Sequence, residues 1–298
     1  MPLAIILNNS AIHSWKVIGG YFRKNFEEQG ISVLEHDLPT TPAARKDLYT
    51  QYPDAVFFHN TLPAPGLPLT DPNCVPDVRW NYLGYRSDVI PGAKNILLPA
   101  YEFSRLPEPW VELYNRYDEI WVTTRHVGEL LRQSGVTQPI LRLPPALDRE
   151  AAPPKTNYAA STPFKFLFVG EPIWRKGIHF LMYGFLKAFP LPGQAQLIVK
   201  TSPNKDWVSL REDIKFVTDK LPREEFLRLY TQSDCYISSS LAEGLGLPIA
   251  EAIMAGLPVC TNDWGGHSDL IDSHSGPPTT TSNRSRRRSP SRGASVIG

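Results

Sequence analysis

The chain has 298 residues, of which 42% are hydrophobic and 20% are charged, and its formal net charge is +1. These values are typical of a globular protein with a sizeable core, and they exclude the disordered and fibrous classes for the chain as a whole. The sequence has no run of eighteen apolar residues, so we expect no membrane-spanning helix. The cysteines have no paired or metal-type spacing, which favours a reducing, cytoplasmic location, and Cys235 and Cys260 are predicted to be buried thiols.

In chain order, the first half alternates strand-like and helix-like segments. Apolar runs bounded by turn residues predict strands at 3–9, 31–38, 54–60, 94–103 and 118–124. Apolar residues at helical spacing predict helices at 14–30, 107–117 and 125–135. Strands that alternate with helices indicate a parallel sheet with crossover helices.

The alternation stops at residue 143 and starts again at 164. Five prolines fall within 143–163, which indicates a linker between domains, and we place this linker at 149–163. After it, strands are predicted at 164–170, 195–201, 234–240 and 258–263, and helices at 176–189, 223–233 and 247–256. The chain is therefore predicted to be α/β, with two Rossmann-like doubly wound domains at 1–148 and 164–275. Ligands of such sheets bind at the carboxyl ends of the strands, and two domains offer a cleft between those ends.

The last segment, 276–298, differs in composition from the rest of the chain. It contains five arginines, no acidic residue and no aromatic residue. Such a segment cannot bury a core, so we expect a disordered basic tail. A solvated tail without a partner is the favoured interpretation. Weak binding of an anionic partner, or a peripheral position at a membrane, stays open, and no specific nucleic-acid partner is expected.

Two glutamates mark the stretch EGLGLPIAE, which follows the predicted strand at 234–240. Glu243 lies on a glycine-rich loop, and Glu251 lies near the start of the following helix. Free backbone amides at such a place form a site for anions or hydroxyl groups. Carboxylates accept hydrogen bonds from vicinal hydroxyls, so the pattern suits a sugar nucleotide, with one acid at the sugar and one at the ribose. An acid that favours the helix dipole, with an exposed helical glutamate, explains the spacing equally well.

The longer stretch EGLGLPIAEAIMAGLPV resembles the E-x7-E signature of glycosyltransferase family 4, whose members are retaining enzymes with the GT-B fold. The resemblance implies that Glu243 is a catalytic residue near the donor sugar and that Glu251 binds the ribose. It also implies that the donor is approached by the loop amides of Gly244, Leu245 and Gly246.

A second stretch, FLFVGEPIWRKGIHFLMYGF, is similar to a unit of the same family that runs from a strand through a glycine and a Lys-Gly pair into a helix. The resemblance assigns Gly170 and Lys176 to the donor, with the lysine at the diphosphate. A cation there stabilises the departing group. Many members have an arginine after the strand glycine, where this chain has Glu171, and we assign Arg175 as the substitute cation. A solvated Arg-Lys pair is the alternative.

The stretch YEFSRLPEPWVELYNRYDEIWVTTRHVGELLRQSGV resembles the acceptor domain of a subset of this family. Glu102 is predicted to lie at a strand end and face the cleft, where it orients the acceptor hydroxyl or accepts its proton. A helix-capping or loop carboxylate is the alternative. His59 ends the strand at 54–60 and is an acceptor-side candidate, although a lone histidine there is more often packed. His126 and Trp174 are weaker candidates.

The resemblance implies a glycosyltransferase that moves a sugar from a nucleotide-sugar donor to a hydroxyl of a sugar, lipid or glycan acceptor, with the retention of configuration that is typical of the family. We see no Asp-x-Asp signature, so we expect no metal ion and no cofactor. The family continues beyond GGHSDLID with further strands and helices, whereas this chain changes composition, so the second domain is expected to be truncated. The alternative function is therefore an inactive homologue or a protein that binds nucleotide sugars.

Overall fold

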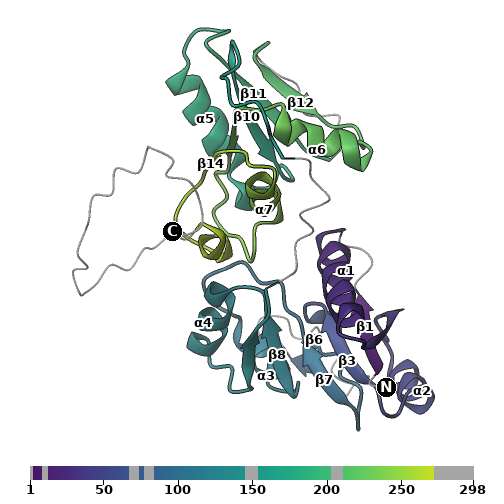
Figure 1. Cartoon of the computed structure of the whole chain (residues 1–298). Helices are drawn as coiled ribbons and strands as arrows, with labels where there is room; N and C mark the ends of the chain where they lie inside the picture. The colour runs from purple at the N-terminus through teal and green to yellow at the C-terminus, as the bar shows by residue number, and fades with distance from the viewer. Residues whose placement is uncertain are drawn as a thin grey trace.

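The computed structural model describes residues 3–8, 13–66, 74–76, 84–144, 154–202 and 211–271. Two parallel sheets, one in each half of the chain, form the framework on which the helices pack (Figure 1). Among these residues, no helix combines the length and the apolar character that a membrane crossing requires. The predicted tail at 276–298 and the predicted truncation of the second domain lie outside the described residues.

The N-terminal sheet has six parallel strands in the order β2-β1-β3-β7-β8-β9. The strands are β1 (Leu3–Asn8), β2 (Ser32–Asp37), β3 (Val56–Asn60), β7 (Lys94–Leu97), β8 (Glu119–Val122) and β9 (Ile140–Arg142). The helices are α1 (His13–Glu28), α2 (Pro42–Gln51), α3 (Glu108–Tyr114) and α4 (Arg125–Gln133). Strand β1 is apolar on both faces, because α1 packs on one side of it and α2 on the other, as is usual in parallel sheets.

The C-terminal sheet has five parallel strands in the order β12-β11-β10-β13-β14. The chain adds strands first on one side of β10 and then on the other, which makes the boundary between β10 and β13 a topological switch point. The strands are β10 (Phe164–Val169), β11 (Ala195–Lys200), β12 (Ile214–Val217), β13 (Cys235–Ile237) and β14 (Val259–Cys260). The helices are α5 (Ile178–Ala188), α6 (Arg223–Thr231) and α7 (Leu247–Met254), with short 3-10 helices η2 (Trp174–Lys176) and η3 (Gly266–Leu270).

A small antiparallel sheet, in the order β4-β6-β5, is inserted between β3 and β7. Its strands are β4 (Ala64–Gly66), β5 (Cys74–Pro76) and β6 (Gly84–Arg86). The ring of Tyr85 in β6 lies 5.6 Å from that of Trp110 in α3, so this sheet packs against the helix that follows β7.

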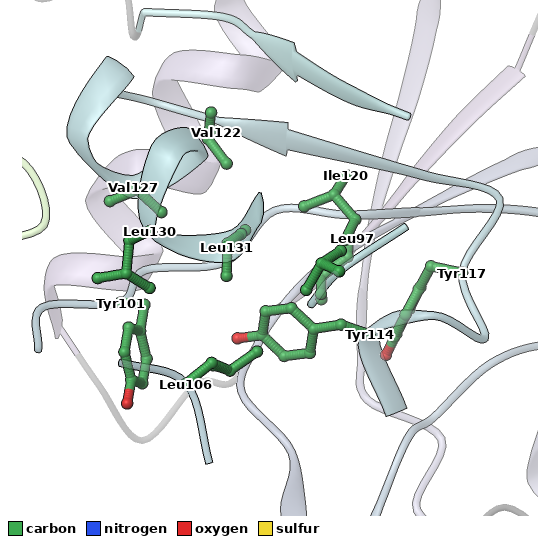
Figure 2. Packing of buried hydrophobic residues seen from close by; sticks show 11 residues of the cluster. Leu97, Tyr101, Leu106, Tyr114, Tyr117, Ile120, Val122, Val127, Leu130 and Leu131 are labelled. Carbon is green, nitrogen blue, oxygen red and sulfur yellow. The ribbon is translucent and has the colours of Figure 1, made fainter. Parts of the chain in front are cut away.

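A buried cluster joins β7 and β8 to α3 and α4 (Figure 2). Helix α4 contributes Val127, Leu130 and Leu131, which have the spacing of one helix face. The cluster also includes Tyr101, whose hydroxyl donates to the carbonyl of Arg105 at 2.6 Å. Since Glu102 directly follows Tyr101, the core anchors the segment that carries this carboxylate.

Several elements differ from the sequence-based predictions. The patterns did not predict α2, which buries only Arg45 and Leu48, nor the short edge strands β9 and β12. The predicted strand at 94–103 ends at Leu97, because Pro99 lacks the backbone N–H that a continued ladder needs. The prediction of a buried Cys260 was wrong: its strand is at the edge of the sheet and its side chain is exposed.

Candidate functional site

The candidate site begins where two loops leave the carboxyl ends of β10 and β13, on either side of the switch point. The loop after β10 leads through η2 to Gly177, which has a φ of +64° and precedes α5. A Cβ atom on Gly177 would lie 2.1 Å from the carbonyl oxygen of Ser239 in the loop after β13. Only glycine therefore fits where these two loops touch.

Lys176 and Glu243 form an ion pair between these loops. The distance from Lys176 Nζ to Glu243 Oε1 is 2.5 Å, and the two side chains are only 13% and 8% exposed. Gly170 lies beside the lysine, since a Cβ atom there would be 3.6 Å from Lys176 Cδ. The structure thus brings together three residues that the two sequence motifs had marked separately.

Arg175 connects this pair to the other half of the molecule. Its Nη2 lies 3.0 Å from Glu102 Oε1, in the segment after β7. Its Nη1 lies 3.6 Å from Glu243 Oε2 and donates a hydrogen bond of 2.7 Å to the carbonyl of Ala242. One guanidinium therefore contacts both candidate catalytic carboxylates.

Glu102 has a perturbed carboxyl group. Burial raises the pKa of Glu102 above its ordinary value, and the negative charge of Glu243 adds to this rise. The positive charges of Arg175 and Lys176 oppose it. Glu102 lies in the loop five residues after the end of β7, not at a strand end as the sequence predicted. A carboxylate with a raised pKa is a better proton acceptor than an ordinary one.

Glu251 in α7 has a different set of partners. Its Oε1 lies 2.8 Å from Arg223 Nη1, and its Oε2 accepts a hydrogen bond of 2.8 Å from the hydroxyl of Tyr230. Its side chain is 13% exposed. Burial is the main cause of the raised pKa of Tyr236, and both Glu243 and Glu251 add to the rise, so the two carboxylates lie near the same buried ring.

His59 is placed away from this cluster. It is fully buried in β3, its Nε2 lies 2.9 Å from Asn95 Oδ1, and its ring packs edge-on against Tyr117. Burial lowers the pKa of His59 to about 4. These surroundings correspond to the packed alternative for this histidine, and we do not retain it as an acceptor-side residue.

The other candidates lie at the edges of the site. Leu245 is buried and Glu171 accepts a hydrogen bond from the hydroxyl of Ser202. Trp174 is 71% exposed and stacks on His179 with ring centroids 4.0 Å apart. His126, in α4, has its ring 5.0 Å from that of Trp264.

Contacts between the two halves include residues that the sequence analysis did not identify. Thr124 caps α4 and also donates a hydrogen bond of 2.9 Å from its hydroxyl to the carbonyl of Gly244. A Cβ atom on Gly244 would lie 2.7 Å from the carbonyl oxygen of Tyr101, so this glycine permits close approach of the acceptor-side segment. A threonine before a predicted helix indicates an N-cap. The sequence pattern cannot show that the same threonine also binds a loop of the other sheet.

A further contact joins α4 to η3. The carboxylate of Asp269 accepts a 2.6 Å hydrogen bond from the backbone N–H of Arg125. It also lies 3.4 Å from the guanidinium groups of Arg125 and Arg142. In Figure 1 the yellow-green segment that contains η3 lies next to α4. All of these contacts involve segments that follow the carboxyl ends of strands, where ligands of parallel sheets bind.

An apolar groove of about 420 Å³ lies elsewhere, between α5 and the ends of β13 and β14. Its lining includes Phe180, Phe185, Ile237 and Cys260 and none of the charged residues of the site, so it is a separate feature. Within the described ranges, no group of three His, Cys, Asp or Glu side chains is placed to hold a metal ion.

Comparison with known proteins supports this fold. Residues 152–277 match the model of a family described as glycosyl transferases group 1. No curated protein matches the chain. Among solved structures, a glycosyltransferase from Rickettsia africae ESF-5 is 12% identical with a TM-score of 0.60, and the alignment covers 91% of this chain and 81% of that one. A sucrose-phosphate synthase from Thermosynechococcus elongatus is 13% identical with a TM-score of 0.58, covering 91% and 83%.

Longer proteins also align, over a smaller share of their length. The pneumococcal O-GlcNAc transferase GtfA, solved in complex with UDP and GlcNAc, is 18% identical with a TM-score of 0.44 over 59% of this chain. The chain spans only 39% of that protein. The two structures that align over 91% of this chain show that it has the α/β fold of the GT-B glycosyltransferases, with parallel sheets, as predicted.

Proposed function

We propose that the protein is a retaining glycosyltransferase of the family 4 type. Residues 164–275 would hold a nucleotide-sugar donor and residues 1–148 an acceptor hydroxyl, with 149–163 as the linker. The observation that carries the proposal is the cluster of Glu102, Arg175, Lys176 and Glu243 at the switch point. The match of residues 152–277 to a glycosyltransferase model supports it.

Each donor residue has a proposed role. Lys176 binds the diphosphate, Glu243 contacts the sugar, and the amides of Gly244, Leu245 and Gly246 approach the donor from the loop. Glu251 accepts hydrogen bonds from the ribose, and Tyr230 and Arg223 hold its carboxylate in place. In this arrangement the binding groups come from rigid strand ends and helix starts, which favours precise placement of the donor.

The proposed reaction needs few protein groups. The bond between the anomeric carbon and the diphosphate oxygen breaks, and its electron pair leaves with the diphosphate beside Lys176. The acceptor oxygen forms its bond to the same carbon from the same face, which retains the configuration. Glu102 either accepts the proton of the acceptor hydroxyl, for which its raised pKa is suited, or orients this hydroxyl while the departing diphosphate takes the proton.

The acceptor is proposed to be a sugar, lipid or glycan, and the names of the sucrose-phosphate synthase and glycosyltransferase structures support sugar transfer in general. We propose that the reaction takes place in the cytoplasm and needs no metal ion. Donor screening begins with the thermal shift of the full chain against a panel of nucleotide sugars, since a ligand that binds the native state raises its melting temperature.

Two variants then test the assigned roles by calorimetry with the selected nucleotide sugar. Lys176→Ala should weaken binding of the nucleoside diphosphate about 10- to 100-fold, because a charge-assisted bond is lost, but should leave binding of the bare nucleoside nearly unchanged. Glu251→Ala should weaken binding of both. Equal losses of diphosphate and nucleoside in Lys176→Ala would contradict the diphosphate role. Binding without any sugar transfer or hydrolysis would favour the alternative of a nucleotide-sugar-binding protein.

A further inference from the structure

Arg175 is attached to the loop after β13 through its backbone as well as its side chain. Its carbonyl accepts a 2.7 Å hydrogen bond from the N–H of Leu241 and a 3.3 Å bond from the hydroxyl of Ser240. Its side chain donates to Ala242 and pairs with Glu243, as described above. The residue is thus held to the whole of the segment 240–243, and its side chain is only 18% exposed.

The other terminal nitrogen of the guanidinium, Nη2, points to the N-terminal half of the molecule and lies 3.0 Å from Glu102 Oε1. A planar guanidinium with five N–H donors can bind a carbonyl and two carboxylates at once, and the short ammonium of a lysine cannot reproduce this geometry. Arg175 therefore links the carboxylate of Glu102 directly to the donor-side loop.

We propose that Arg175 is a positioning residue, which ties the acceptor-side carboxylate of Glu102 to the donor-side loop 240–243, rather than a ligand of the donor diphosphate. The effect of Arg175 on catalysis rests on the function proposed above. The contact between Arg175 and Glu102 does not depend on that function. The inference replaces the role of substitute cation that the sequence suggested for Arg175, because its guanidinium is already paired with two carboxylates and bonded to a carbonyl.

Electrostatics agree with this assignment. The charged groups that face Glu102 are Arg175 and Lys176 of η2 and Glu243 of the loop after β13. Arg175 is the largest of the charge effects and lowers the pKa of Glu102 against the dominant effect of burial. Without the guanidinium, the carboxyl of Glu102 would keep its proton to a higher pH.

The decisive experiment does not need catalysis. In protein labelled with 13C at glutamate side chains, the Glu102 signal is assigned by its loss in Glu102→Gln and then titrated by NMR. We expect the pKa of Glu102 to be higher in Arg175→Gln than in the wild type, and intermediate in Arg175→Lys. Arg228→Gln, which removes an exposed arginine paired with Glu224 on α6, is the matched control and should leave it unchanged. An unchanged pKa in folded Arg175→Gln, or in Arg175→Lys if the first variant does not fold, overturns the proposal.

Kinetics and binding separate this inference from the proposed function. With an active donor, kcat of Arg175→Gln should fall about 10- to 100-fold, as misplacement of a catalytic group does, and the acidic limb of its pH profile should move to higher pH. Its affinity for the nucleoside diphosphate should change less than about threefold, far less than the loss expected in Lys176→Ala. A loss as large as that of Lys176→Ala would make Arg175 a diphosphate ligand and overturn the proposal. If no donor binds, the proposed function is wrong. The NMR titration still tests whether Arg175 contacts Glu102.

Discussion

For Glu102 and His59, burial is the largest cause of the pKa shift and the neighbouring groups come second. The two residues differ in their surroundings, since His59 is fully buried beside the amide of Asn95, whereas the side chain of Glu102 is 32% exposed and has charged neighbours. The amide oxygen of Asn95 accepts hydrogen bonds from both Ile90 N–H and His59 Nε2, which fixes the neutral tautomer of the ring with the proton on Nε2. This histidine therefore stays neutral where an ordinary one would take up a proton.

The lowered pKa of His59 predicts a specific pH dependence of stability. The unfolded chain protonates this residue near pH 6.5, whereas the native state resists protonation down to about pH 4. Stability should therefore fall as the pH drops from 6.5 to 4, by at most about 3 kcal/mol from this residue. His59→Gln should lose less stability than the wild type over the same interval, as measured by urea unfolding at pH 7 and pH 5. Parallel losses in the two proteins would contradict the assignment.

At the scale of elements, two helices of the C-terminal half begin in the same way. Helix α5 follows Gly177 and α7 follows Gly246, and both glycines have the positive φ of a left-handed conformation. This conformation turns the chain sharply after a strand and aims the start of each helix at the site, where its free N–H groups and dipole favour an anion. Lys176 directly precedes Gly177, and Glu243 lies on the loop just before Gly246, so both charged residues are close to these helix starts.

Gly177→Ala should destabilise the protein by about 2–4 kcal/mol, because the new methyl group would clash with the carbonyl of Ser239 in a backbone region that alanine disfavours. Gly184→Ala, on the exposed side of α5 with nothing within 4 Å of the added Cβ, is the matched control. It should stabilise the helix by about 0.5–1 kcal/mol. Thermal or urea unfolding of both variants measures the difference. A Gly177→Ala variant as stable as the control would show that the loops relax around the methyl group.

On the scale of the whole molecule, the two sheets are joined through segments at the carboxyl ends of their strands. The tie at Arg175 is one such joint, and the contact of Asp269 with the start of α4 is another. The Asp269 carboxylate is 6% exposed and faces the N-terminus of that helix, where a negative charge is favourable.

Asp269→Asn should weaken the second joint by about 1–3 kcal/mol, because it removes a charge that accepts a backbone hydrogen bond and faces two arginines. Hydrogen exchange should become faster at the Arg125 amide and in η3, while β10 and β1 keep their protection. Asp263→Asn, at an exposed acid in the preceding loop, is the control and should change neither region. Unchanged exchange at Arg125 in Asp269→Asn would show that the contact contributes nothing to the joint.

The amino-acid sequence by itself determined the α/β class and most strands and helices of the two series, and it placed Lys176 and Glu243 after the ends of two predicted strands. Each of these follows from short-range patterns. A run of apolar residues indicates a buried segment, and the period of the apolar residues separates strands from helices. The strand ends of one parallel sheet lie together. The domain boundaries and the roles of the site residues stay predictions. The fold also contains α2, β9 and β12, whose short or polar segments have too little apolar periodicity to be recognised.

Only the tertiary structure decided which distant segments meet. No spacing in the sequence could show that Arg175 reaches Glu102, that Thr124 binds the carbonyl of Gly244, or that Asp269 faces α4. The same holds for His59, since its strand pattern is compatible with either a cleft or a core position, and the covering elements made it a core residue. Local patterns record how much of a segment is buried, whereas the partner that buries it depends on how the two sheets are placed in space.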